Sequence, residues 1–110
     1  MAVTQPFQVW LEAEHWAPGQ WVPRNTNSDV AVTFADGTRW TATFFSYENV
    51  ATLRLKNQET GECLAGRYLW CTNMILVDEV TRARVEQVVA DLVTSGEFES
   101  AFDGPHSPAV

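Results

Sequence analysis

Hydrophobic and polar residues alternate along the stretch VAVTFADGTRWTATFF, residues 30–45. Alternation with a period of two predicts two β-strands, here on either side of Asp36 and Gly37. A two-residue turn would leave the apolar faces of the two strands on opposite sides. A three-residue loop that ends with Gly37 in the left-handed region pairs Val32 with Trp40 and puts both apolar sets on one face. Because a one-residue slip inverts every side chain, we predict this loop and a buried face. The predicted core face carries Val30, Val32, Phe34, Trp40, Ala42 and Phe44.

The opposite face of the hairpin carries threonines, Arg39 and Phe45, a composition that favours partial exposure or light cover. Ahead of the hairpin, residues 7–16 allow two interpretations, because their apolar positions fit either a strand or a short helix. We prefer the strand. Residues 17–29 contain two prolines, a glycine and two asparagines, which predicts a loop.

Two helices are predicted after the hairpin. Ser46 can act as the N-cap of a short helix that ends near Lys56, and residues 57–62 are predicted as a turn. The clearer helix runs from Thr81 to Gly96, because its apolar residues recur with helical spacing and a glycine stands at its end. Its many valines are mediocre helix formers, so packing against a sheet must hold this helix. The apolar residues are Val85, Val88, Val89, Leu92 and Val93.

Residues 67–77 are apolar on both alternating sets, which predicts a central strand with Trp70 and Cys71 inside it. The order of elements is strand, strand, strand, helix, strand, helix. We therefore predict an α+β fold, an antiparallel sheet of about four strands with two helices packed on one face. The chain is predicted to be a single domain, residues 1–110, with loose ends at about 1–5 and 104–110. Phe98 and Phe102 are predicted to anchor the segment before the C-terminal end.

Charge and composition narrow the class of partner. The chain has 110 residues, of which 45% are hydrophobic, and fourteen acidic against seven basic side chains give a formal charge of −7. This charge repels phosphates and anionic membranes, so we predict a basic protein partner, no nucleic acid and no membrane. No apolar run approaches the ~18 residues of a membrane span, and the N-terminus lacks the layout of a secretory signal. These features predict a cytoplasmic protein.

Motifs for catalysis are missing from the sequence. It contains no glycine-rich phosphate loop, HExxH, GxSxG or CxxC pattern. Cys63 and Cys71 are interpreted as reduced thiols, Cys71 as an inert core thiol. His15 follows Glu14 directly, and adjacent side chains on a strand point to opposite faces, so the two do not form a catalytic pair. We predict no catalytic residue, no metal and no cofactor.

Aromatic and acidic side chains are the remaining candidates for binding. Trp16 and Trp21 flank Pro18 and Gly19 in the predicted loop, where a large ring either folds back over the core or faces a partner. Carboxylates gather near residues 12–14 and 97–103, while Asp78 and Glu79 precede a helix and are interpreted as stabilising its positive end. The predicted partner-binding residues are Glu12, Glu14, Trp16, Trp21, Glu97, Glu99 and Asp103.

Small size, negative charge, an α+β layout and the lack of catalytic motifs together suggest a type of protein. In this general layout the whole chain resembles the immunity proteins of bacterial toxin systems, which are small, often acidic and commonly α+β. The resemblance rests on no motif and transfers no residue. It implies inhibition of a basic partner, such as a toxin, by steric and electrostatic occlusion. Two alternatives remain: a subunit or adaptor of a larger assembly, and a small ligand-binding domain or enzyme that uses Cys63, Cys71, His15 and Tyr47.

Overall fold

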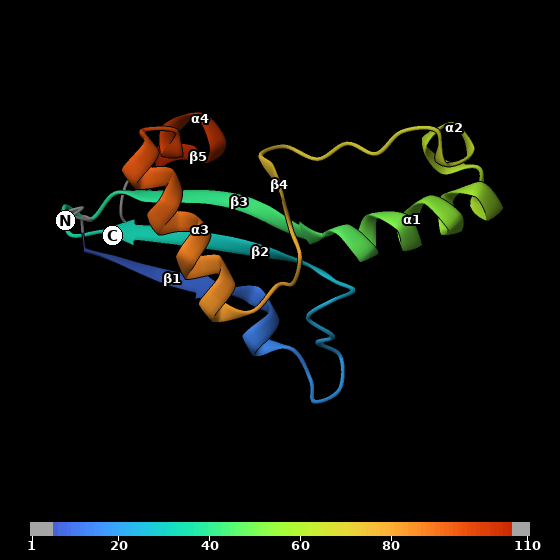
Figure 1. Ribbon diagram of the computed structural model, residues 1–110, viewed down its shortest axis with the longest axis horizontal. Helices are drawn as coiled ribbons and strands as arrows, with labels where there is room; N and C mark the ends of the chain where they lie inside the picture. Colours follow the sequence, from blue (N-terminus) through green and yellow to red (C-terminus); the bar gives the residue numbers. More distant parts are fainter. Residues whose placement is uncertain (1–5, 107–110) are drawn as a thin grey trace.

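The computed structural model describes residues 6–106, and its centre is one sheet of five strands (Figure 1). Strands β1, β2 and β3 are antiparallel neighbours. The free edge of β3 is shared, because β4 pairs in parallel with Thr43–Ser46 and β5 pairs antiparallel with the part from Arg39 to Thr41. The α+β class is therefore as predicted. The strands are β1 (Phe7–Leu11), β2 (Asn27–Phe34), β3 (Arg39–Ser46), β4 (Met74–Val77) and β5 (Asp103–His106).

The hairpin of β2 and β3 has the predicted register. Val32 lies opposite Trp40, and the amide of Phe34 donates to the carbonyl of Thr38 at 3.0 Å. Gly37 has φ 87°, the left-handed conformation that the three-residue loop requires. The register confirms that the apolar sets of both strands share a face.

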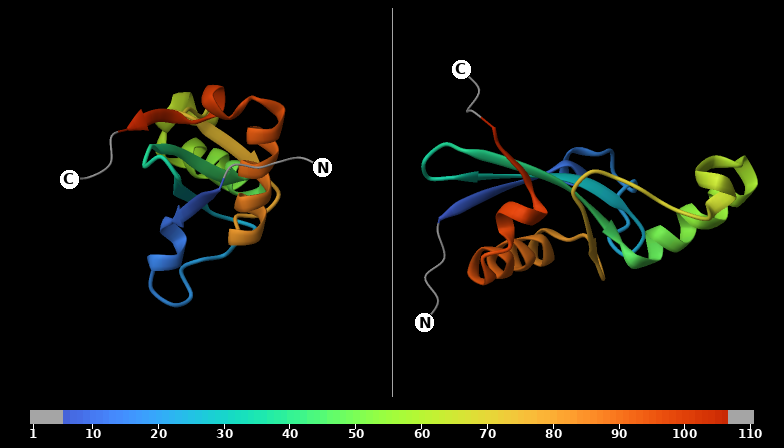
Figure 2. Two further views of the ribbon diagram at one scale, coloured as in Figure 1. Left: turned by 90° about the vertical axis from the view of Figure 1, so that its left-hand side faces the viewer. Right: turned by 90° about the horizontal axis from the view of Figure 1, so that it is seen from above.

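The buried face of the sheet is covered by α3 (Arg82–Ser95) and α4 (Phe98–Ala101), as Figure 2 shows for α3. The Thr81 hydroxyl accepts from the Arg84 amide, and Gly96 ends the helix with φ 80°, as predicted. Val85 and Val89 are completely buried against the sheet. The core also contains residues of all three antiparallel strands and of the segment after α3. These are Val9, Leu11, Val30, Val32, Trp40, Ala42, Phe44, Phe98 and Phe102.

Residues 7–16 combine the two structures that the sequence allows. After β1, residues Glu12–His15 form a single turn of 3-10 helix, η1. The buried amide of Ala13 donates to Ser28 Oγ at 3.0 Å, which fixes this turn to the start of β2. Glu12 and Glu14 therefore lie on a helical turn and not on one side of a strand.

The helix α1 (Tyr47–Thr60) is longer than predicted. Ser46 caps it as expected, because its Oγ accepts from the Asn49 amide at 3.2 Å, but residues 57–60 are helical and Gly61 ends the helix with φ 86°. The helix continues beyond the end of β3 and does not lie over the sheet (Figure 1). The prediction that two helices pack on one face is therefore not confirmed, because the direction in which β3 ends carries α1 away from the core.

A left-handed turn follows α1. Within α2 (Glu62–Gly66), the residues Cys63, Leu64 and Ala65 all have φ between 51° and 56°, which costs a non-glycine residue ~1–2 kcal/mol. From this turn residues 67–73 run back beside α1 to β4 (Figure 1). We call residues 47–73 the arm.

The prediction of a central strand over residues 67–77 is wrong. Only Met74–Val77 form a strand, β4, which lies at the edge of the sheet. Trp70, predicted in the core, is 76% exposed, and Cys71 is only partly buried and lies outside the strand. The physical reason is that β5 occupies the other half of the β3 edge, so little of this edge remains for pairing.

The predicted loose ends fall largely outside the described residues, namely 1–5 and 107–110. Residues 104–106 belong to β5, where they extend the sheet. Phe98 and Phe102 are both buried and stack on each other with ring centroids 4.4 Å apart. They anchor this end as predicted.

Candidate functional site

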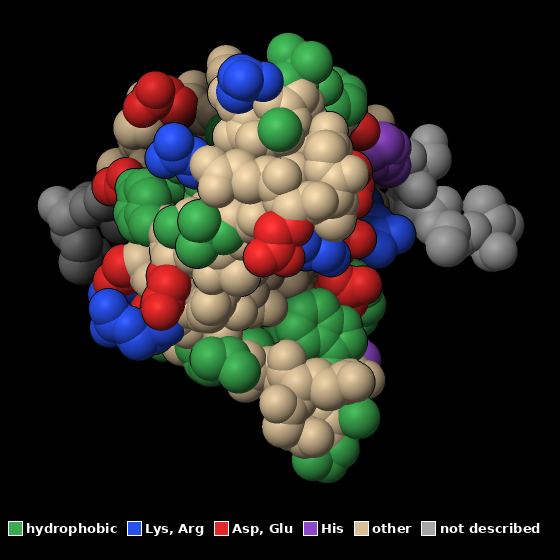
Figure 3. Space-filling model, turned by 90° about the vertical axis from the view of Figure 1, so that its right-hand side faces the viewer, with side chains coloured by type: hydrophobic (Ala, Val, Ile, Leu, Met, Phe, Trp, Pro, Cys, Tyr) green, Lys and Arg blue, Asp and Glu red, His purple; other side chains and the backbone are tan. Residues whose placement is uncertain are grey.

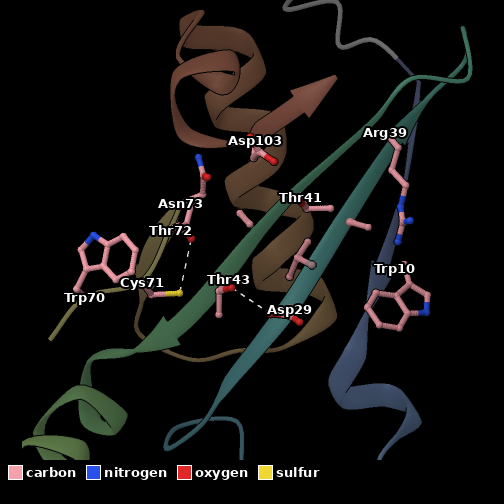
Figure 4. Close-up of a pocket in the computed structure, with 13 residues that line it drawn as sticks. Trp10, Asp29, Arg39, Thr41, Thr43, Trp70, Cys71, Thr72, Asn73 and Asp103 are labelled. Atoms are coloured by element: carbon pink, nitrogen blue, oxygen red, sulfur yellow. Dashed lines mark hydrogen bonds between the residues drawn. The ribbon is translucent and has the colours of Figure 1, made fainter. Parts of the chain in front are cut away.

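The face of the sheet turned away from α3 holds an open groove of about 640 Å³ (Figure 4). Its floor comes from β2 and β3, whose side chains alternate between the core and this face. Thr41 and Thr43 lie between the core residues of β3 and supply short polar side chains to the floor. The sequence pattern that buries one face therefore also builds the polar floor of the other.

Two exposed tryptophans border the groove, one on each side (Figure 4). Trp10 on β1 is 44% exposed and stacks on His15, with ring centroids 5.4 Å apart. Trp70, at the base of the arm, is 76% exposed. Rings of this size are frequent energetic anchors of protein interfaces, because they bury a large area at little entropic cost.

Three charged side chains complete the groove. Asp29 Oδ1 accepts a hydrogen bond from the Thr43 hydroxyl at 3.0 Å, and Asp103 Oδ2 lies 3.0 Å from His106 Nε2. Arg39 is exposed, forms no ion pair with another described residue, and extends into the groove in Figure 4. The groove thus offers two carboxylates and one guanidinium between two indole rings.

One side chain that lines the groove, Cys71, carries a thiol. The thiol of Cys71 donates to the Thr72 carbonyl at 3.6 Å, and it has no hydrogen bond to either described histidine. Among residues 6–106 no group of three or more histidine, cysteine or acidic side chains is placed to hold a metal ion. Within residues 6–106, no hydrogen bond joins this thiol to a base that would activate it.

Glu14, a predicted partner-binding residue, is engaged within the molecule. Arg82 donates to both of its carboxylate oxygens, at 2.6 and 2.8 Å, and also to the Val9 carbonyl at 3.0 Å. This hydrogen bonding holds the pKa of Glu14 below its ordinary value and raises that of Arg82. The pair ties η1 to the start of α3.

Asp78 and Arg84 form a second pair at the start of α3. Arg84 Nε donates to Asp78 Oδ1 at 2.9 Å, and this hydrogen bond lowers the pKa of Asp78. The arrangement agrees with the interpretation of Asp78 as a residue that stabilises the start of the helix.

The tryptophans of the predicted loop fold back over the core. Trp16 and Trp21 both pack against the core, and Trp21 Nε1 donates to the Val80 carbonyl at 2.9 Å. Of the two alternatives left open by the sequence, the structure has the first. Both rings are only partly exposed.

The remaining predicted residues do not lie on one surface. Glu12 accepts from the Asp29 amide at 3.2 Å, while Glu97 and Glu99 are exposed at α4, on the covered side of the sheet. Only Asp103 lines the groove. Trp10 and Trp70 were not predicted as binding residues. The alternation of Trp10 with Val9 and Leu11 was a usable signal, because it directs the ring away from the core.

No match to this chain was found among protein-family models, among curated proteins or among solved structures. Over residues 6–106, no helix has both the length and the apolar character needed to cross a membrane.

Proposed function

We propose that this chain is a small acidic binding protein that holds a basic protein partner in the groove of its open sheet face. By occupying the partner's functional surface it inhibits the partner, as an immunity protein inhibits a toxin. The observation that supports the proposal is the groove itself, bordered by the exposed rings of Trp10 and Trp70. Exposed rings beside a polar floor match the anchors and rim of a protein interface.

The charges of the groove and of the molecule favour a cationic partner. Asp29 and Asp103 can accept hydrogen bonds from lysine or arginine, and an indole ring attracts the same cations through its face. The formal charge of −7 speeds the approach of a basic protein and repels nucleic acid. Arg39 supplies one donor for a carboxylate or carbonyl of the partner.

The proposal makes a first prediction, for capture of the partner. The immobilised full chain, exposed to a lysate of its native source, retains one basic protein whose association rate falls steeply as salt rises. Trp10→Ala and Trp70→Ala each weaken the complex at least tenfold, since buried rings are typical hot spots. Tyr47→Ala removes a ring outside the groove that is 61% exposed, between the values of Trp10 and Trp70, and leaves the affinity unchanged.

Four outcomes of this experiment would contradict the proposal. Capture of an acidic protein, or an association rate that does not depend on salt, would contradict electrostatic attraction between the chain and a basic partner. Equal effects of Tyr47→Ala and Trp10→Ala would remove the groove as the binding site. A captured protein that keeps its full activity while bound would rule out inhibition by occlusion.

A further inference from the structure

The arm carries most of the large hydrophobic side chains that are strongly exposed in the described chain. Of the eight large hydrophobic side chains that are most exposed between residues 6 and 106, five lie on the arm. They project from α1, from the left-handed turn and from the segment that returns to β4. These five are Tyr47, Leu55, Leu64, Tyr68 and Trp70. Several large apolar side chains exposed in one part of a molecule suggest a surface for a partner.

The shape of the arm leaves these five side chains largely uncovered by the described residues. α1 points away from the core (Figure 1), and a recess of about 630 Å³ lies between α1 and residues 65–69. The start of α1 is fixed to the sheet by hydrogen bonds of Asn49 to Asn25 and Asn27, while the later turns of the helix have no such support among the described residues. The strained left-handed turn holds Leu64 at the end of the arm, 66% exposed.

The charge of the arm differs from that of the remaining chain. Arg54, Lys56 and Arg67 balance Glu48, Glu59 and Glu62, so the formal charge of −7 belongs entirely to the residues outside the arm. Figure 3, which views the molecule from the end where the arm lies, shows hydrophobic side chains among both acidic and basic ones. Two copies of this chain repel each other least when they approach arm to arm, while a basic partner is attracted to the acidic remainder.

The returning segment offers backbone groups as well as side chains. No backbone amide of residues 69–72 donates a hydrogen bond to any described residue. Exposed and partly buried side chains alternate from Tyr68 to Thr72, as they do on a strand at the edge of a sheet. Such a segment can pair antiparallel with the same segment of a second copy, which is the self-complementary contact of a two-fold dimer.

The exposed apolar area of the arm supplies a substantial part of such a contact. With roughly 150–250 Å² for a large aromatic side chain, the exposed parts of Leu55, Leu64, Tyr68 and Trp70 amount to about 400 Å² per copy. This is about half of the ~800 Å² that one partner gives to an interface of standard size. The backbone of residues 69–72 and the walls of the recess supply further surface.

We propose that the arm is the surface through which two copies of this chain form a dimer. Leu55 and Leu64 become buried against the second copy, and residues 69–72 of the two copies pair across the two-fold axis. The formal charges of the arm cancel and it carries large exposed apolar side chains, so we expect a dimer that does not weaken as salt rises. This proposal and the proposed function share residues 70–72, which line the groove, so the dimer is tested at Leu55 and Leu64, which lie outside the groove.

Sedimentation velocity of the purified full chain over a range of concentrations and salt tests the proposal. The wild type forms a dimer at micromolar concentration in both low and high salt, and Leu55→Glu and Leu64→Glu each weaken it at least tenfold. Val22→Glu is the matched control, because Val22 is 53% exposed and lies outside the arm, and it leaves the dimer intact. Far-UV circular dichroism of each variant verifies that it is folded.

A wild type that stays monomeric at a concentration of several hundred micromolar would overturn the dimer. Equal dissociation of the dimer by Val22→Glu and by Leu64→Glu would also overturn the arm as its interface. If Leu64→Glu misfolds, Leu64→Ser provides the smaller change, with the same expected direction. Failure of the dimer is distinguishable from failure of the proposed function, because Leu55→Glu is expected to capture the basic partner as the wild type does.

Discussion

Arg82 connects three parts of the chain through its guanidinium group. It donates to Glu14 on η1, to the carbonyl of Val9 on β1 and, at 3.2 Å, to Glu86 one turn further along α3. The guanidinium is partly exposed, so solvent screens the pair and its net contribution to stability is modest. Its main consequence is geometric, since it fixes η1 and therefore the neighbouring ring of Trp10 beside the groove.

The pKa of Glu14 leads to a prediction on pH. Because this pKa is lower in the folded chain than the ordinary value of 4.5, the ionised carboxylate stabilises the fold above pH 4.5, and this stabilisation is lost as the pH falls through the folded value. Glu14→Gln should therefore lower the free energy of unfolding by about 0.5–1 kcal/mol at pH 7 and by almost nothing near pH 3. Urea denaturation of the wild type and of Glu14→Gln at the two pH values measures this difference in unfolding free energy.

The control for this prediction is Glu99→Gln, at an exposed glutamate that forms no ion pair with the described residues. It should change stability little at either pH. A loss in Glu14→Gln that is as large at pH 3 as at pH 7 would show that the ion pair with Arg82 is not its cause.

Ser46 has two roles through one oxygen atom. Its Oγ accepts from the Asn49 amide and from the Thr26 amide, both at 3.2 Å, and the side chain is completely buried. Ser46→Ala removes the N-cap of α1, worth about 1 kcal/mol, and leaves a buried amide unpaired, worth about 1–3 kcal/mol. The expected loss in unfolding free energy is about 2–3 kcal/mol by urea denaturation. Ser100→Ala, at an exposed serine, is the control. If Ser46→Ala lowers the unfolding free energy no more than Ser100→Ala does, the two hydrogen bonds of Ser46 do not hold the start of α1.

At the scale of elements, packing decides the position of α3. Val85 and Val89 lie one turn apart and are completely buried on the sheet. Val89→Ala removes two buried methyl groups, each worth about 0.8 kcal/mol of transfer free energy, and leaves a cavity. It should therefore lower the unfolding free energy by about 2–3 kcal/mol. Thr94→Ala, on the exposed side of the same helix, should cost less than 0.5 kcal/mol. Equal losses in the two variants would mean that α3 is not held by this stripe.

Elements with one buried face were predictable from the sequence. The register of β2 and β3 could be predicted because the three-residue loop places Val32 and Trp40 on the same side of the hairpin. The position of α3 in the sequence could be predicted from its apolar stripe and its caps. The length of α1 did not follow, because α1 has no continuous apolar stripe to extend the pattern past Lys56. The period of apolar residues shows which residues are buried in a core, and most residues of the arm do not contact the core.

The candidate site was harder to predict than the fold, for a related reason. An apolar run such as residues 67–77 looks the same whether its rings are buried or exposed to a partner. The pattern therefore places Trp70 in the core, although its ring is exposed. It makes Trp16 and Trp21, near prolines and polar residues, candidates for partner binding, although both rings pack against the core. Only the strand pairing, in which β4 and β5 share the edge of β3, determines which rings are exposed.

At the scale of the whole molecule, the surface has two regions of different composition. One sheet face is covered by α3 and α4, and the other carries the groove, while the arm extends beyond the sheet (Figure 1). The negative charge lies outside the arm, and much of the exposed apolar surface lies on it. In our account the groove therefore binds the basic partner, and the arm binds a second copy.

The five tryptophans test the central claim, that the open sheet face is the binding surface. Each gives one indole N–H signal in a ¹⁵N-correlated NMR spectrum, and the captured basic partner is added stepwise to the labelled chain. We predict that the signals of Trp10 and Trp70 shift or broaden, while those of Trp16, Trp21 and Trp40, which pack in or against the core, remain in place. Shifts confined to Trp16 and Trp21, with Trp10 and Trp70 unchanged, would contradict the account.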